Sequence, residues 1–499
     1  MQCKPCILLI IVYTLFLFLF LYNKKDIKEQ LRTQSLTLSK CISRMKKAEV
    51  VIISSPGVGH LVSTLEFAKL LINRDNRLRI TILVMKFPHT TEIDVYTKSL
   101  AIDDSLNIVD LPECSLPPNS NITSGMVDLL KAQKPNVKKA VSNLTKAPEN
   151  GVLAAFIVDM FCTTMIDVVK EFSVPTLVFF TSGLLQQTEL AIRGFANSVP
   201  SNTLPSSVLR KEWESFFMSY AKGLKNADAI IVNSFEELES YAVHSFVSHP
   251  DLAGLPIYPV GPILNPKPKT KSAIDSDDIV KWLDDQPPSS EVFLCFGSRG
   301  FFDEDQVKEI ALAVENTGVR FVWSLRKPPP KDTMNAPSDY TLSDLSSVLP
   351  EGFLDRTAEI GRVIGWAPQT HILAHPATGG FVSHCGWNST LENIYFGVPV
   401  ATWPLFADQQ TNAFQLVCEL KMAVEIALDY RLEFNGESNY LLTADKIERG
   451  IKSVLDKDGE VRKKVKEMSA ASKKTLLDGG SSYTYLGRLI DYIRYQVSK

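Results

Sequence analysis

Two residues far apart in the chain, His60 and Asp159, have the side chains of a proton-transfer pair. His60 ends the turn Ser-Pro-Gly-Val-Gly-His, whose glycines permit a tight bend, and a helix is predicted from Leu61. A helix N-terminus disfavours imidazolium, so we expect a neutral His60 that accepts a proton. Asp159 follows the apolar run Leu153–Val158, and a carboxylate bonded to one ring nitrogen fixes the tautomer of an imidazole. A histidine in a glycine turn is often structural, but the carboxylate favours a general base.

A second group of polar side chains comprises His384, Asn388 and Ser389. Gly379-Gly380 open a predicted strand that leads into this group, and Thr390–Asn393 has the pattern of a helix. Unpaired N–H groups and the helix dipole make such a turn an anion site. A diphosphate would satisfy these donors without a metal. The alternative is a capped turn that binds nothing.

Short runs of Val, Ile and Leu alternate with amphipathic stretches in the first half of the chain. Continuous apolar runs at this spacing indicate a parallel sheet covered on both faces. Ser234–Glu237 has capping-box spacing and should open the helix after the last strand. The predicted strands are Val50–Ser54, Arg79–Val84, Leu153–Val158, Thr176–Phe180 and Ala229–Val232.

A proline-rich stretch beginning at Tyr258 interrupts this alternation and predicts a linker, because proline continues neither a helix nor a sheet interior. The alternation then resumes, which predicts a second α/β domain with a long surface loop over Arg326–Leu349. Two doubly wound domains place ligands in the cleft where strand ends and helix N-termini meet. The predicted strands here are Val292–Phe296, Arg320–Leu325, Arg362–Ile364, Gly380–Ser383 and Val398–Trp403.

The length and composition of the chain also fit a globular protein of two domains. A chain of 499 residues exceeds one ordinary core, so two domains are expected. Hydrophobic residues make up 45% and charged residues 22%, as in globular proteins. The formal charge of −3 argues against nucleic acid as a partner. The eight cysteines are scattered, and several lie in apolar runs, which suits a reducing compartment.

Residues 1–44 differ from the rest of the chain. The run Cys6–Tyr22 is apolar and is followed by Lys24, Lys25 and Lys28, so a membrane span with the bulk of the chain in the cytosol is one interpretation. A second is a gene-model extension, with Met45 as the natural start. A secretory signal is the third, but no small-residue cleavage site follows the run.

The segment Trp366–Gln409 closely resembles the donor-binding signature of plant family 1 UDP-glycosyltransferases over its full length. The wider resemblance covers residues 45–499. It implies the GT-B fold, an α/β architecture of two doubly wound Rossmann-like domains facing a central cleft. It also implies uracil stacking on Trp366, with Ala367 beside it, and ribose binding by Gln369 and Glu392. The diphosphate would be held by Ser298, His384, Asn388 and Ser389, and the sugar by Trp387, Asp408 and Gln409.

The resemblance extends to the proton-transfer pair, since both His60 and Asp159 match the family pattern, and Thr181 matches a residue near the transferred sugar. It implies an inverting transfer of glucose from UDP-glucose to a hydroxyl of a flavonoid, lignan, triterpenoid or other phenolic. Gln409 and the retained Trp387 favour glucose. Arg299 departs from the pattern, because relatives usually carry an apolar residue there.

Three alternatives stay open: another UDP-sugar donor, glucose esters as products, and an inactive UDP-sugar-binding protein. UDP-glucose is expected as a co-substrate, with no cofactor and no metal. The expected partners are a UDP-sugar and a lipophilic small molecule, in a monomeric cytoplasmic protein whose membrane association would depend on residues 6–22. The loops 111–127 and 183–213, with Phe161 and Phe216 as apolar walls, are expected to select the acceptor.

The resulting domain prediction divides the chain into five parts. They are the apolar segment 1–44, an acceptor-binding domain 45–262, a linker 263–280, a UDP-sugar-binding domain 281–478, and a C-terminal helix 479–499 that packs back on the first domain.

Overall fold

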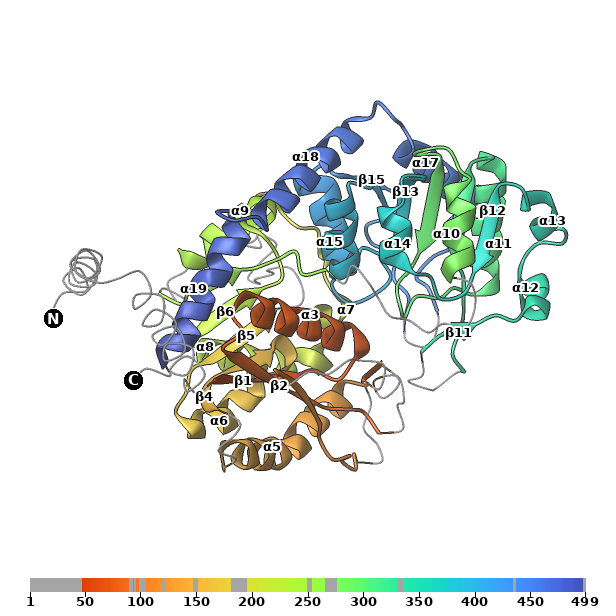
Figure 1. The fold of residues 1–499 in the computed structure, drawn as a ribbon. Helices are drawn as coiled ribbons and strands as arrows, with labels where there is room; N and C mark the ends of the chain where they lie inside the picture. Colours follow the sequence, from red (N-terminus) through yellow and green to blue (C-terminus); the bar gives the residue numbers. More distant parts are fainter. Residues whose placement is uncertain are drawn as a thin grey trace, which may run out of the picture. The chain divides into compact units, whose positions relative to one another are not determined.

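The computed structural model describes residues 47–88, 93, 96–97, 105–117, 122–146, 151–180, 195–248, 254–264, 276–330, 336–433 and 437–496. The chain separates into two units, Met1–Lys47 and Ala48–Lys499, and every element below belongs to the second (Figure 1). The segment 1–44, with its three interpretations, lies outside the described residues. Within the described part of the chain, no helix is both long and apolar enough to cross a membrane.

The first half of the second unit forms a seven-stranded parallel sheet in the order β3-β2-β1-β4-β5-β6-β7. All seven residues of β1 are buried, which explains the continuous apolar run Val50–Ile53. The strands are β1 (Ala48–Ser54), β2 (Leu78–Val84), β3 (Leu106–Asp110), β4 (Val152–Asp159), β5 (Thr176–Phe180), β6 (Ala229–Val232) and β7 (Ile257–Pro259). The helices are α3 (Val58–Arg74), α5 (Ile122–Lys146), α6 (Ile166–Val169), α7 (Ser206–Leu209), α8 (Glu214–Lys225) and α9 (Glu236–Val247).

The second half forms a six-stranded parallel sheet in the order β12-β9-β8-β13-β14-β15. Its strands are β8 (Glu291–Cys295), β9 (Arg320–Ser324), β12 (Gly361–Ile364), β13 (Thr378–Ser383), β14 (Val400–Thr402) and β15 (Ala423–Glu425). Its helices are α10 (Ser276–Asp284), α11 (Glu304–Thr317), α12 (Leu342–Val348), α13 (Phe353–Thr357), α14 (Gln369–Ala374), α15 (Trp387–Phe396), α16 (Gln409–Phe414), α17 (Ala444–Val454) and α18 (Glu460–Thr475). Two doubly wound Rossmann-like domains are therefore confirmed.

Several details differ from the sequence predictions. β3, β7 and β15 are short strands that the apolar pattern did not reveal, and Tyr258-Pro259 is part of β7 rather than of a linker. A strand tolerates proline at the sheet edge, where β7 lies. The predicted linker 263–280 overlaps α10, which begins at Ser276. The helix after β6 is present, but Phe235 is its N-cap and no side chain caps it, so the capping-box prediction was wrong.

The predicted surface loop Arg326–Leu349 also contains regular structure. A two-stranded antiparallel hairpin pairs β10 (Arg326–Lys327) with β11 (Ser338–Asp339), and α12 follows it. Thr341 caps α12 by accepting a hydrogen bond from the backbone N–H of Asp344 at 3.2 Å. The polar residues between Arg326 and Leu349 therefore belong in part to a hairpin and to a helix N-cap, and not only to an exposed loop.

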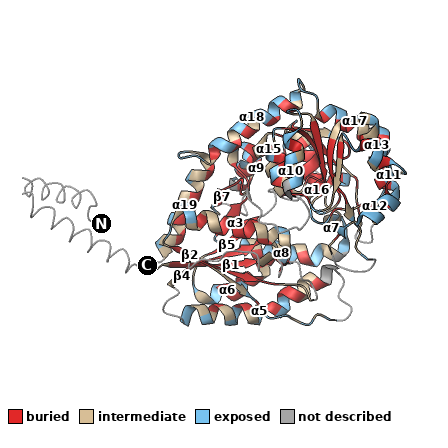
Figure 2. Ribbon diagram, turned by 45° about the vertical axis from the view of Figure 1, so that its right-hand side comes forward, coloured by how far each residue is buried: buried red, intermediate tan, exposed pale blue. Residues whose placement is uncertain are grey.

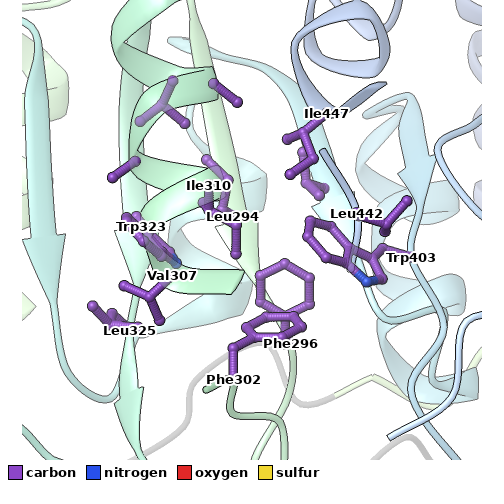
Figure 3. Packing of buried hydrophobic residues seen from close by; sticks show 14 of the residues in the cluster. Leu294, Phe296, Phe302, Val307, Ile310, Trp323, Leu325, Trp403, Leu442 and Ile447 are labelled. Atoms are coloured by element: carbon purple, nitrogen blue, oxygen red, sulfur yellow. The ribbon is translucent and has the colours of Figure 1, made fainter. Parts of the chain in front are cut away.

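Buried residues concentrate on the two sheets and on the inner faces of the helices around them (Figure 2). In the second domain, Phe296, Phe302 and Trp403 form an aromatic cluster, with ring centroids 4.6 to 5.4 Å apart (Figure 3). Ile310 of α11 packs in the same core. Phe296 and Trp403 directly follow β8 and β14, so the cluster anchors the start of the loops that leave these two strands.

The C-terminal helix α19 (Ser481–Tyr495) follows α18 and packs against the first sheet (Figure 1). Its apolar face, comprising Leu486, Leu489, Ile490 and Ile493, is buried in the same cluster as β1 and β2. The last helix of the chain thus completes the core of the first domain. The exact domain boundaries stay predictions.

Replacement of Ile310 by alanine should lower the free energy of unfolding by about 2–5 kcal/mol, because the side chain is fully buried. Leu312 lies on the same helix but is 45% exposed, so Leu312→Ala should change stability by about 0.5 kcal/mol or less. Urea denaturation of both variants measures the difference, and equal shifts in midpoint would contradict the assigned packing.

Candidate active site

His60 and Asp159 lie at the point where the strand order of the first sheet reverses. β1 and β4 are neighbours in this sheet, and the chain leaves them toward opposite sides, which opens a crevice at their carboxyl ends. Asp159 is the last residue of β4. The helix after β1 begins at Val58 rather than at the predicted Leu61, so His60 lies in the first turn of α3.

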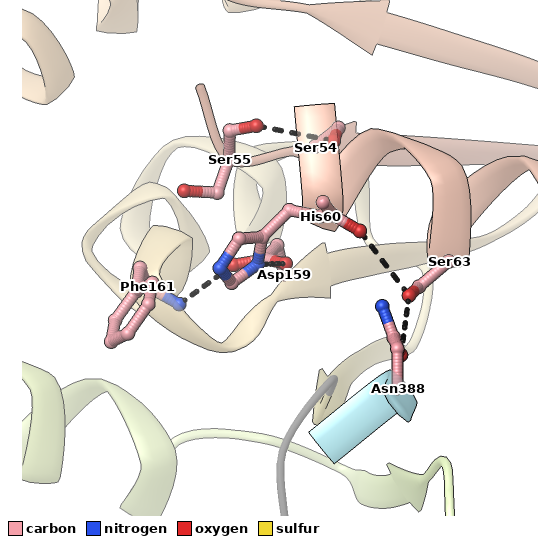
Figure 4. Close-up of polar contacts among 8 residues, drawn as sticks. Ser54, Ser55, His60, Ser63, Asp159, Phe161 and Asn388 are labelled. Carbon is pink, nitrogen blue, oxygen red and sulfur yellow. Dashed lines mark hydrogen bonds and ion pairs between the residues drawn. The ribbon is translucent and has the colours of Figure 1, made fainter. Parts of the chain in front are cut away.

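The two side chains form a hydrogen bond of 2.7 Å between His60 Nδ1 and Asp159 Oδ2 (Figure 4). The other carboxylate oxygen, Oδ1, accepts a hydrogen bond from the backbone N–H of Phe161 at 3.0 Å. Asp159 is 1% exposed, whereas 26% of the His60 side chain is exposed. The carboxylate is therefore held by its surroundings, and the imidazole presents an edge to the crevice.

A helix N-terminus was expected to lower the pKa of His60, but the pKa of His60 is raised, so this expectation is wrong. Burial alone lowers the pKa of His60, but the charge of Asp159, its hydrogen bond and the charge of Asp408 together raise it above 6.5. A carboxylate at hydrogen-bond distance outweighs the partial charge of a helix end. His60 is thus a stronger base than an isolated imidazole.

The polar turn of the second domain lies at the corresponding reversal point, between β8 and β13. Ser298 is exposed in the turn after β8, and His384 follows β13. A Cβ atom at Gly297 or at Gly386 would approach His384 Nε2 to 2.5 Å, so both glycines are required by the imidazole between them. Burial lowers the pKa of His384 to about 4, which makes it neutral at physiological pH.

Gln369, Ser389 and Glu392 form one hydrogen-bonded group. Gln369 Nε2 donates to Ser389 Oγ at 2.8 Å and to Glu392 Oε2 at 2.6 Å. Burial raises the pKa of Glu392 to about 7, although the bond from Gln369 acts in the opposite direction. The structure thus brings together α14 and α15 through three of the predicted site residues.

Trp366 and Ala367 lie just before this group, after β12. Trp366 is 40% exposed, whereas Ala367 is buried. The guanidinium of Arg326 lies 5.1 Å from the centroid of the Trp366 ring and is paired with Asp339 at 3.0 Å. One side of this exposed indole is therefore occupied by a cation held in the β10–β11 hairpin.

Two of the predicted residues connect the domains. Ser63 of α3 donates a hydrogen bond of 3.2 Å to Asn388 Oδ1 at the start of α15 (Figure 4). Trp387 is buried and donates its indole N–H to the backbone oxygen of Asn233 at 2.7 Å, so this N–H is already engaged within the protein. The N-termini of α3 and α15 consequently face a common crevice.

Asp408 is the N-cap of α16, and Gln409 is the first residue of this helix. Burial raises the pKa of Asp408, whereas its bond from Asn412 and the charge of His60 lower it. Gln409 Oε1 accepts hydrogen bonds from the backbone N–H groups of Leu405 and Phe406 at 2.9 and 3.0 Å, which leaves the amide NH₂ as the group that can be offered to a ligand. Ala407, just before them, has φ of 60°, a conformation that clusters at ligand sites in non-glycine residues.

A row of aromatic rings extends from His60 within the first domain. The Phe161 ring lies 5.2 Å from His60, and Phe216 lies 6.0 Å from Phe161. Trp213 meets Phe216 edge-on at 5.6 Å. The imidazole therefore borders an apolar surface.

Sequence reasoning missed Ser63, Asn233 and Arg326, which contact predicted site residues. Asn233 lies in Val232-Asn233-Ser234-Phe235, and a polar side chain directly after a buried strand is a usable signal. Ser63 and Arg326 carried no such signal, because their partners come from distant segments. Thr181 lies outside the described residues. Among the residues that the structure describes, no group of three or more His, Cys, Asp or Glu side chains could hold a metal ion.

Comparison with known proteins agrees with this geometry. Residues 292–433 match the family model described as UDP-glucoronosyl and UDP-glucosyl transferase. The chain is 49% identical to the UDP-glucose flavonoid 3-O-glucosyltransferase 6 of Fragaria ananassa, over 90% of this chain and 100% of that protein.

Two solved structures are similar as well. One is a transferase from Siraitia grosvenorii in complex with UDP, with 42% identity, a TM-score of 0.78, and coverage of 90% of this chain and 100% of the other. The second is UGT71G1 of Medicago truncatula with UDP-glucose, with 38% identity, a TM-score of 0.78, and coverage of 90% and 98%. With its two facing Rossmann-like domains, the chain belongs to the plant UDP-glycosyltransferases of the GT-B fold and is an enzyme of that family.

Proposed function

We propose that this enzyme transfers glucose from UDP-glucose to a hydroxyl of a lipophilic plant metabolite and forms a β-O-glucoside with inversion at the anomeric carbon. The observation that carries the proposal is the 2.7 Å hydrogen bond between His60 and Asp159 at the reversal point of the first sheet. The name of the Fragaria relative supports UDP-glucose as donor and a flavonoid as acceptor. Lignans, triterpenoids and other phenolics belong to the same acceptor class.

In the proposed mechanism His60 is the general base. Because Nδ1–H is donated to Asp159, Nε2 carries the lone pair that accepts the proton of the acceptor hydroxyl. The acceptor oxygen then bonds to the anomeric carbon, and the bond from that carbon to UDP breaks, its electron pair leaving with UDP. A single displacement inverts the configuration, and Asp159 stabilises the imidazolium that forms.

We assign the diphosphate of the donor to the N-terminus of α15, beside Ser298, His384, Asn388 and Ser389. His384 lies in this turn between Gly297 and Gly386, and its neutral imidazole carries an N–H donor. Backbone N–H groups and the dipole of α15 favour a negative charge at the same place. UDP is therefore stabilised as a leaving group without displacement of other contacts.

The rest of the donor is assigned to residues that flank this turn. The exposed ring of Trp366 suits a planar base, and the Gln369–Glu392 pair suits vicinal hydroxyls. Asp408 and Gln409 are assigned to the sugar, with the Gln409 NH₂ as a donor. Thr181 stays a proposed sugar contact.

The acceptor is assigned to the apolar surface beside His60. Phe161 supplies aromatic contact area beside His60, and the buried Phe216 packs against it, which favours a flat, lipophilic molecule. An acceptor hydroxyl that points to His60 would have its ring system against these residues. The proposal therefore favours phenolic and terpenoid alcohols over sugars or acids as acceptors.

The first test is acceptor-dependent release of UDP from UDP-glucose by the full chain, with a panel of flavonoids, lignans and triterpene alcohols. His60→Ala should lower kcat by about 10²- to 10⁴-fold, the usual contribution of a general base. His244→Ala, which removes an exposed histidine on α9, should behave as the wild type. If the protein binds UDP tightly but releases no UDP from UDP-glucose with any acceptor, the result would favour the hypothesis of an inactive UDP-sugar-binding protein.

The pH dependence of kcat/KM provides a second test. The reaction needs neutral His60, so kcat/KM should rise with pH through an apparent pKa above 6.5 and level off at higher pH. Asp159→Asn removes the charge that raises this pKa, so the midpoint should move to lower pH while the plateau falls. An unchanged midpoint in Asp159→Asn would show that His60 is not the titrating base.

The third test concerns the base of the nucleotide. Trp366→Ala should raise the Kd for UDP by about 5- to 150-fold, since stacking of a base on an aromatic side chain contributes ~1–3 kcal/mol. Tyr495→Ala, at an exposed position on α19, is the control. Isothermal titration calorimetry measures both, and equal affinities would remove Trp366 from the donor site.

A further inference from the structure

The segment Phe195–Arg210, here termed the strap, belongs to the first domain in sequence but contacts the second. Phe195 and Val199 are buried in one small cluster with Phe414 of α16, and the rings of Phe195 and Phe414 lie 5.8 Å apart. These residues belong to the loop 183–213, which we expected to select acceptors. This part of the loop therefore packs on the second domain, to which the donor is assigned.

Polar contacts fix the strap along its length. At its start, the Glu419 carboxylate accepts hydrogen bonds from the backbone N–H of Ala196 at 3.0 Å and of Asn197 at 2.9 Å. Further along, Arg431 donates to the backbone oxygens of Asn202 and Leu204 at 2.7 and 2.6 Å. At its end, Arg210 pairs with Glu433 at 2.6 Å. These contacts leave the strap little freedom to move independently of the second domain.

The contact nearest to the active site is made by Thr411. Its hydroxyl donates to the backbone oxygen of Thr203 at 3.0 Å, and both residues are at most 2% exposed. Thr411 lies in the first turn of α16, two residues after Gln409. On another side of the same helix, Asn412 donates to the backbone oxygen of Cys385 at 3.0 Å. The start of α16 is thus held by the strap and by the loop after β13.

The strap continues from α7 into α8, which carries Phe216 of the aromatic row beside His60. The 3-10 turn of the strap (Ser201–Thr203) contacts α16. Figure 2 labels α16 and also α7, the short helix that follows this turn in the strap. One continuous stretch of chain therefore joins the proposed acceptor surface to the helix that begins with Asp408 and Gln409.

We infer that the strap positions the sugar-binding end of the donor site, with Thr411 as the positioning residue through its hydrogen bond to Thr203. Thr411 sets the placement of α16 and hence of Asp408 and Gln409 against the first domain. Its hydroxyl contacts none of the residues assigned to UDP, which lie on α14, α15 and the turns after β8, β12 and β13. The inference rests on the proposed function in one respect, the assignment of the sugar to Asp408 and Gln409.

The test compares the affinities of the full-length Thr411→Val and Thr411→Ser variants for UDP and for UDP-glucose by calorimetry. Valine keeps the shape but leaves the buried Thr203 oxygen without its donor, whereas serine keeps the hydroxyl. Thr411→Val should bind UDP-glucose about tenfold more weakly and UDP within about twofold of the wild type, as expected for loss of one hydrogen bond. Thr411→Ser should bind both as the wild type does.

Equal losses for UDP and UDP-glucose, or no loss for either, would overturn the inference. Glu419→Ala removes the contacts to Ala196 and Asn197 at the start of the strap and keeps the Thr411 hydroxyl. It should also weaken UDP-glucose binding selectively, and it replaces Thr411→Val if that variant does not fold. Gln409→Ala separates this inference from the proposed function. If Gln409→Ala leaves the affinity for UDP-glucose unchanged, the assignment of the sugar to Gln409 fails. If Gln409→Ala weakens UDP-glucose binding selectively but Thr411→Val leaves it unchanged, the proposed role of the strap fails.

Discussion

Parallel pairing within both sheets determines where the chemistry of this enzyme takes place. Every strand of a parallel sheet delivers its following loop to the same edge, and the reversal of strand order opens a crevice between two of those loops. In the first sheet these loops bring His60 and Asp159 within 2.7 Å, although 99 positions separate them. In the second sheet they bring the turn after β8 next to His384. The site is therefore formed by topology first and by side-chain contacts second.

Much of this could be predicted from the sequence, because buried parallel strands leave a strong signal. The runs Thr176–Phe180 and Ala229–Val232 are strands with the predicted bounds. Polar residues directly after such runs, as at Asp159, belong to the carboxyl edge and are thus recognisable. Edge strands such as β15 were missed because three residues are too few to show periodicity.

The features that the sequence did not predict depend on distances between residues from separate segments, and a sequence pattern does not give such distances. Ser63 and Asn388 meet across the domains, and no local feature of either segment indicates the other. The pKa of His60 is a second case: the helix N-terminus was visible in the sequence, but the balance between burial, Asp159 and Asp408 required the geometry. The same holds for the indole of Trp387, whose N–H is donated to Asn233 and is thus part of the domain interface. Residue identity indicated which groups to propose for the site, and geometry shows which of them contact one another.

The packing of α19 against the first sheet has a consequence for how the enzyme is made. A ribosome synthesises β1 well before α19, yet Leu489 and Ile493 of α19 fill the same apolar cluster as Ile52 of β1. The apolar surface of the first domain that α19 covers therefore stays uncovered until α19 itself has been synthesised. Because the second domain lies between β1 and α19 in the sequence, the core of the first domain is completed only after the second domain has been synthesised.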